Sequence, residues 1–139
     1  MTKTFNPIPE EIRETHNVYF GIPELVIKKT KIIDDIICRY FNIPQSALRL
    51  KVRSWELSIP RFLAMYMYYT YTNLSFTKIG LLLGGFKSGS VSSALRRVQN
   101  NAKHDSEFND IKTDISNRIE AKLRNTELVW IDREKLENR

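Results

Sequence analysis

Apolar residues recur at helical spacing along most of this 139-residue chain. The first stripe falls three and four residues apart, which marks one face of an α-helix, and consists of Ile33, Ile36, Ile37, Tyr40 and Phe41. It predicts a helix that begins near Pro23 or Thr30, with Thr30 as a candidate cap and Asp34 and Asp35 near its positive end. Asn42-Ile43-Pro44 ends this helix, and Pro44 to Leu48 predicts a short helical turn.

The next helix is predicted from Ser58 to about Thr72. Ser58 is a favourable N-cap, and Pro60 falls in the first turn. Residues 65–71, Met-Tyr-Met-Tyr-Tyr-Thr-Tyr, make this helix aromatic on several faces. A helix that is apolar all round is usually enclosed by its neighbours, so burial is the main expectation. Two alternatives stay open: rings that stack on single-stranded nucleic acid, and a dimer contact.

Residues 75–103 predict two helices joined by a glycine turn. A short helix follows Ser75, Gly84 and Gly85 stop it, and a second helix opens on small polar residues at 88–90. The second helix has a core-facing stripe made of Val91, Ala94, Leu95 and Val98. Its opposite face presents Ser93, Arg96 and Asn100, flanked by Ser92, Arg97 and Lys103. This is a helix-turn-helix, and a second helix with a polar, basic outer face suits the major groove of DNA.

A last helix is predicted from about Ser106. We therefore expect an all-α multi-helix bundle that contains the helix-turn-helix. Three parts are expected: an extended arm at 1–22, a helical domain at 23–123 and an extension at 124–139. Residues 128–131, Leu-Val-Trp-Ile, suit a short strand, a packing latch or a partner contact. The last helix should bury Phe108, Ile111, Ile115, Ile119 and Leu123.

Positive charge is concentrated around the helix-turn-helix. Residues 49–103 hold nine Lys and Arg but only one acidic residue, Glu56, so this segment has a net charge of +8. The whole chain has a net charge of +6, so the remaining residues sum to −2. No acidic residue lies between Ser58 and Lys103. A field this concentrated favours a polyanionic partner. The alternative to a DNA-contact role for Lys87, Arg96 and Lys103 is that they simply form a solvent-exposed helix face.

No catalytic or metal-binding set emerges. His16 and His104 are far apart and do not belong to a metal-ligand spacing. Cys38 is the single cysteine and is expected in the core. No secretion segment or membrane-spanning run is evident. The sequence thus predicts a cytoplasmic protein that is not an enzyme and has no cofactor, metal or membrane partner.

Over about Thr30 to Leu123 an ordered set of residues carries a family resemblance. It runs through Tyr40-Phe41-Asn42-Ile43, Leu48, Lys51, Arg53-Ser54, Pro60-Arg61, Ala64-Met65-Tyr66, Leu74-Ser75, Lys78-Ile79-Gly80, Gly84-Gly85 and Val91. In this set the chain resembles the C-terminal DNA-binding domain of the bacterial replication initiator DnaA, a helix-turn-helix of the Trp-repressor-like type. No Gly-rich phosphate-binding loop is present. The resemblance implies a free-standing relative without the ATPase part, of phage or mobile-element origin.

The resemblance implies contacts with double-stranded DNA in three zones. Arg53 matches the arginine that the family inserts in the minor groove, where its flat cation suits the enhanced negative potential. Arg61, Ser75 and Lys78 match positions near the phosphate backbone. For Arg53 and Arg61 the alternative is a surface ion pair.

The third zone is the start of the recognition helix, where this chain departs from the family. Lys87, Ser88, Gly89 and Ser90 stand where the family shows Asp-His-Thr-Thr, and Phe86 replaces a usual arginine. Lys87 suits guanine acceptors, the two serines suit several base edges, and glycine permits close approach. We expect the docking mode to be kept and the target site to differ.

Further along this helix, Ser93, Arg96 and Arg97 complete the candidate DNA surface. The alternative role for Ser88 and Ser90 is helix capping. The rival function is a protein-interaction module that contacts a replication or transcription partner through the Tyr-rich helix and the C-terminal tail.

Overall fold

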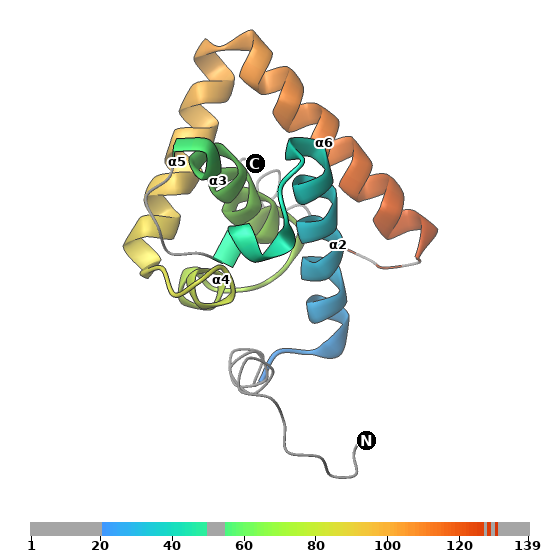
Figure 1. The fold of residues 1–139 in the computed structure, drawn as a ribbon. Helices are drawn as coiled ribbons and strands as arrows, with labels where there is room; N and C mark the ends of the chain where they lie inside the picture. Colours follow the sequence, from blue (N-terminus) through green and yellow to red (C-terminus); the bar gives the residue numbers. More distant parts are fainter. Residues whose placement is uncertain (1–20, 50–54, 127, 129, 131–139) are drawn as a thin grey trace, which may run out of the picture.

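The described part of the chain contains only helices and the turns that connect them, in agreement with the predicted all-α class (Figure 1). The structure is a computed structural model that describes residues 21–49, 55–126, 128 and 130. Five α-helices and one 3-10 helix occupy these residues, and none of them forms a strand. The elements are α2 (Glu24–Phe41), η1 (Gln45–Arg49), α3 (Trp55–Tyr71), α4 (Phe76–Leu82), α5 (Ser88–His104) and α6 (Ser106–Asn125).

Helix α3 lies at the centre of the domain. It packs against α2, α4, α5 and η1, while α5 and α6 meet at residue 105 and form two sides of a wedge around it (Figure 1). Met67 and Tyr68 are fully buried, and Tyr66 and Tyr71 are nearly so. The expectation that this aromatic helix is enclosed is confirmed. Tyr69 is partly buried, and its ring packs on Phe76 at a centroid distance of 5.6 Å.

Two helix starts differ from the sequence prediction. Helix α2 begins directly after Pro23, so the alternative start at Thr30 is wrong; the Thr30 hydroxyl instead donates to the Ile27 carbonyl at 2.7 Å, inside the helix. Helix α3 begins at Trp55, three residues before the predicted cap Ser58. Because α3 begins earlier than predicted, Pro60 lies inside the helix and not in its first turn.

Asp34 was expected near a helix terminus, but it lies in the middle of α2 and is 1% exposed. Its carboxylate accepts hydrogen bonds from the Tyr68 hydroxyl and from Arg49 Nη2, each at 2.6 Å. Burial raises the pKa of Asp34, while the Arg49 charge and the Tyr68 hydrogen bond act in the opposite direction. These contacts join α2, α3 and η1 at one point.

Helix α6 buries the apolar face that its spacing predicts, with one exception. Phe108, Ile115, Ile119 and Leu123 are buried, whereas Ile111 is only partly buried at the edge of the core.

The last described residues pack against the domain. Leu128 N–H donates to the Leu123 carbonyl at 2.8 Å, and the Trp130 ring lies edge-on to Tyr71 at 6.0 Å between centroids. Of the three alternatives for residues 128–131, packing is what the structure shows for Leu128 and Trp130; Val129 and Ile131 lie outside the described residues. Residues 1–20 of the predicted arm and most of the extension also lie outside them, so the three-part division stays a prediction.

Cys38 is buried, as predicted, and burial raises the pKa of its thiol to about 11. No helix in the described ranges is long and apolar enough to cross a membrane.

Candidate nucleic-acid interface

The turn of the helix-turn-helix is built around Gly80. A Cβ at this position would lie 2.0 Å from the Phe86 carbonyl oxygen, so only glycine fits. The Gly80 carbonyl accepts hydrogen bonds from the N–H groups of Gly85 and Phe86, both at 2.9 Å. The end of α4 and the approach to α5 are therefore locked together, and this sets the angle between the two helices.

The first helix of the motif begins as predicted, at the cap Ser75. Its Oγ accepts a hydrogen bond from the Lys78 N–H at 3.2 Å. An N-cap serine uses its oxygen as an acceptor, so its own O–H proton still serves as a donor. Ser75 is exposed and Lys78 is half-buried.

The end of η1 rests against the same turn. Gly84 has a φ of +111°, and a Cβ there would lie 2.6 Å from the Arg49 carbonyl oxygen. Arg49 is in turn tied to Asp34. The basic segment that carries Arg53 follows Arg49 directly in the sequence. Arg53 itself lies outside the described residues, so its minor-groove role stays a prediction.

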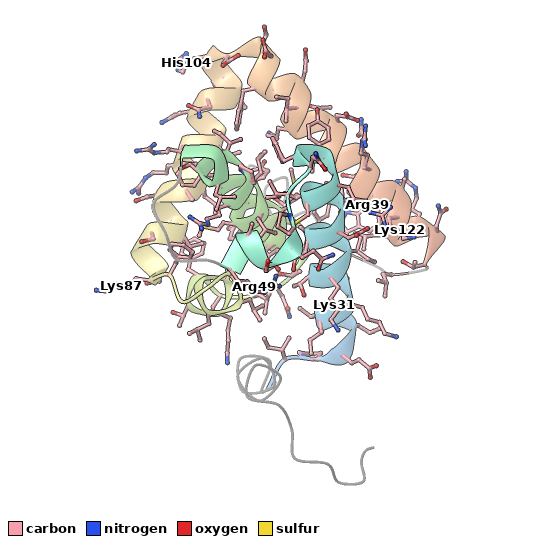
Figure 2. The ribbon with its side chains drawn as sticks, viewed as in Figure 1. Lys31, Arg39, Arg49, Lys87, His104 and Lys122 are labelled. Atoms are coloured by element: carbon pink, nitrogen blue, oxygen red, sulfur yellow. The ribbon has the colours of Figure 1, made fainter. Side chains whose placement is uncertain are left out.

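Helix α5 divides into a buried and an exposed face, as predicted. Val91, Ala94, Leu95 and Val98 are buried. No acidic residue occurs in α5. Lys87 and His104 mark its two ends along one edge of the molecule, opposite Lys31, Arg39 and Lys122 (Figure 2). The exposed residues include Lys87, Ser88, Gly89, Ser90, Ser93, Arg96, Arg97, Asn100 and Lys103.

The N-terminus of α5 has no side-chain cap, unlike those of α4 and α6. Lys87 takes the N-cap position, and its carbonyl accepts from the N–H groups of Ser90 and Val91. The alternative that Ser88 and Ser90 cap this helix is therefore wrong. First-turn N–H groups have no partner within a helix, and they carry a partial positive charge that suits an anion.

Two arginines on α5 have local contacts that leave their charge in place. The Arg97 guanidinium lies 5.4 Å from the centroid of the Phe62 ring. Arg96 Nη2 donates to Ser93 Oγ at 3.5 Å. Both residues remain exposed, so a solvated face remains the alternative for this cluster.

Arg61 differs from the other predicted contact residues because it is only 6% exposed. Its Nη2 donates to the Ala47 carbonyl at 3.5 Å, and its guanidinium lies 5.7 Å from the centroid of the Phe86 ring. Phe86, which stands where the family has an arginine, thus supplies an aromatic surface for a buried cation. The surface ion pair weighed for Arg61 does not fit this burial, and a phosphate contact there stays a prediction.

Sequence reasoning missed the links among Asp34, Tyr68 and Arg49. One signal was available: Asp34 lies beside Ile33, and Ile37 and Cys38 follow at positions three and four residues on, so it falls next to the apolar stripe rather than opposite it. A carboxylate at such a position needs internal partners. Within the described residues, no group of three or more His, Cys, Asp or Glu is placed to hold a metal ion.

Comparison with known proteins agrees with this geometry. A family model for the bacterial dnaA protein helix-turn-helix matches residues 30–98, which span most of α2, then η1, α3, α4 and the buried face of α5. The chain is also similar to the chromosomal replication initiator protein DnaA of Bacteroides fragilis (strain YCH46), with 34% identity over 99 residues. That match covers 69% of this chain and 20% of the relative, so the chain spans about a fifth of the relative's length. Through residues 30–98 this chain belongs to the bacterial DnaA helix-turn-helix family.

Proposed function

We propose that this chain binds double-stranded DNA sequence-specifically, with α5 in the major groove. The observation that carries the proposal is the exposed outer face of α5, which has cations and small polar groups but no acid. A B-DNA major groove admits one α-helix. The Gly80 turn holds α5 at a fixed angle to α4, as a helix-turn-helix needs for docking.

The start of α5 reads base edges. Lys87, Ser88 and Ser90 are exposed there, and nothing lies within 4 Å of a Cβ built on Gly89. DNA thus has room to approach the helix backbone. Lys87 donates to guanine O6 and N7, and the serines meet neighbouring base edges.

Phosphate contacts supply most of the affinity and fix the orientation on the duplex. We assign them to the Ser75 hydroxyl, Lys78, Arg96 and Arg97, with Arg53 in the minor groove. Arg61 is given a supporting role instead. Its contacts with Ala47 and Phe86 join η1 to the turn and so support the start of the Arg53 loop.

The relative's name, chromosomal replication initiator protein, supports a proposed role in replication or its regulation. The rival partner-binding function relied on the Tyr-rich helix and the C-terminal tail. Tyr66, Tyr68 and Tyr71 are buried, and Trp130 packs on Tyr71. No described feature therefore favours the rival.

The proposal is tested by selecting bound duplexes from a random library, then measuring affinity for the selected duplex and a scrambled one. Lys87→Ala should reduce the ratio of the two affinities about tenfold, because a good side-chain contact to a base provides roughly 1–3 kcal/mol of discrimination. The matched control is Lys31→Ala, an exposed lysine on the opposite edge of the molecule (Figure 2). It should leave the ratio unchanged.

Lys78→Gln should instead weaken binding to both duplexes equally and lower the slope of log K against log salt by about 0.9. If Lys87→Ala lowers both affinities by the same factor, Lys87 is a phosphate contact and the assignment of base reading to it is wrong. If wild-type protein enriches no duplex, sequence-specific binding is refuted.

A further inference from the structure

A polar hollow lies between the C-terminal half of α5 and the first turns of α6. It has a volume of about 420 Å³. Three cations, three amides and one alanine line it, and none of the lining residues is acidic: Arg96, Gln99, Asn100, Ala102, Lys103, Asn109 and Lys112. We infer that this α5–α6 hollow binds a phosphate of the DNA backbone, with Lys112 of α6 as a further contact residue; the inference rests on the DNA binding proposed above.

The lining selects an anion. Arginine, lysine and side-chain amides all present N–H donors, and phosphate oxygens accept such bonds strongly when the donor is charged. Like charges that share one site repel each other. Among the described residues, Arg96, Lys103 and Lys112 form no ion pair with a carboxylate, while the nearby Asp114 pairs with Arg118 at 3.2 Å. An anion in the hollow would relieve this repulsion.

Lys112 is held in place without losing its charge. Its ammonium lies 5.0 Å from the centroid of the Tyr66 ring, and Tyr66 is only 3% exposed. A cation–π contact orients an ammonium group but leaves its positive charge uncompensated. The group is therefore positioned before a ligand arrives, which lowers the entropy lost on binding.

The position of the hollow along α5 favours backbone phosphate over bases. Arg96, Asn100 and Lys103 follow at i, i+4 and i+7, so they share one face, and that face also carries Ser93. Ser88 and Lys103 are fifteen residues apart, about 22 Å along the helix axis at 1.5 Å per residue. The major groove is only about 12 Å wide. With the start of α5 on the bases, its far end reaches the groove edge, where a phosphate strand runs.

The experiment compares Lys112→Met with Lys112→Arg on the full chain. Methionine removes the charge but keeps an apolar stem over Tyr66, and arginine keeps the charge. Lys112→Met should weaken binding to selected and scrambled duplexes alike by about tenfold, in the range expected for a bond to a charged group, and lower the salt slope by about 0.9. Lys112→Arg should stay within about twofold of wild type, because it keeps both charge and donors. Urea unfolding of each variant checks that the fold is intact.

Lys122→Met is the matched control. Lys122 is an exposed lysine of the same helix, but it lines a different hollow, between α2 and α6. Affinity and slope should both equal the wild-type values. If Lys112→Met retains the wild-type slope while Lys78→Gln lowers it, DNA binding stands and the α5–α6 hollow is excluded as a phosphate site on DNA.

A second measurement does not depend on DNA. Titration with inorganic phosphate, followed by NMR of side-chain amides, should shift Asn100 and Asn109 and leave Asn125 of the α2–α6 hollow unmoved. The shifts should disappear in Lys112→Met. Absence of these shifts would overturn the anion site. If phosphate shifts these amide signals but Lys112→Met keeps the wild-type salt slope of duplex binding, the DNA-backbone role is overturned. The hollow would then bind another phosphate-bearing ligand, such as a phosphorylated protein.

Discussion

Two regions of the domain differ in how strongly their surroundings restrict the residue at each position. One is the set of buried contacts beneath the helix-turn-helix, here called the buried joint, and the other is the outer face of α5. The buried joint consists of Asp34, Arg49, Tyr68, Gly80, Phe86 and Arg61. In the joint, Asp34 has two bonds of 2.6 Å and Gly80 has no room for a methyl group. On the outer face, Ser88, Gly89 and Ser90 are exposed, and the helix start has no side-chain cap. The joint determines how the domain presents α5, whereas residues on the outer face can change without disturbing the packing.

This contrast accounts for the departure from the family at positions 87–90. Replacing Asp-His-Thr-Thr by Lys-Ser-Gly-Ser disturbs no packing, because these side chains are exposed. Phe86 is different, since its carbonyl and ring contact Gly80 and Arg61. A substitution there has to fit these buried contacts.

The strongest test of the contrast uses two glycines of the same motif. Gly80→Ala should lower the free energy of unfolding by about 4 kcal/mol, because it overpacks a backbone contact and disrupts two hydrogen bonds. Gly89→Ala should raise it by roughly 0.5 kcal/mol, since alanine is the better helix former and its methyl group meets nothing. Urea unfolding followed by circular dichroism measures both. Equal effects would show that the turn is not tight.

The next test compares two neighbouring aspartates of α2. Asp34→Ala should lower the free energy of unfolding by about 3 kcal/mol, which is the lower end of the range for breaking a buried ion pair. The lower end applies because the Arg49 side chain is 35% exposed and water can partly solvate its charge. Asp35→Ala removes an exposed pair with Arg39 and a long, exposed hydrogen bond from Gln45 Nε2 at 3.5 Å. It should lower the free energy of unfolding by only about 0.5 kcal/mol. The same unfolding assay applies. If Asp34→Ala changes the free energy of unfolding as little as Asp35→Ala does, Asp34 does not stabilise the buried joint.

The smallest expected effect separates the two assignments for Arg61. Arg61→Met should lower the free energy of unfolding by about 1 kcal/mol, because it removes the hydrogen bond to Ala47 and the cation–π contact with Phe86. It should leave the salt slope of duplex binding unchanged. Lys78→Gln should show the reverse pattern, with stability nearly intact and a slope lower by about 0.9. A reduced slope in Arg61→Met would restore Arg61 as a phosphate contact.

The helices and most of their buried faces could be predicted from the sequence alone. Val91, Ala94, Leu95 and Val98 are buried as their spacing predicts, since residues three and four apart share one side of a helix. The glycine turn and the Ser75 cap were also predictable, because turn and cap chemistry depends on residues close together in the chain. Exposure of the polar face of α5 follows from the same local rule.

The positions of the remaining charged groups, in contrast, depend on how the helices pack. Arg61 lies in the basic segment like Lys78, yet it is buried against Ala47 and Phe86. Lys112 belongs to a different helix from Arg96, and the two line one hollow only because α6 folds back against α5. Such contacts join residues distant in the sequence, and local spacing carries no information about which helices will meet.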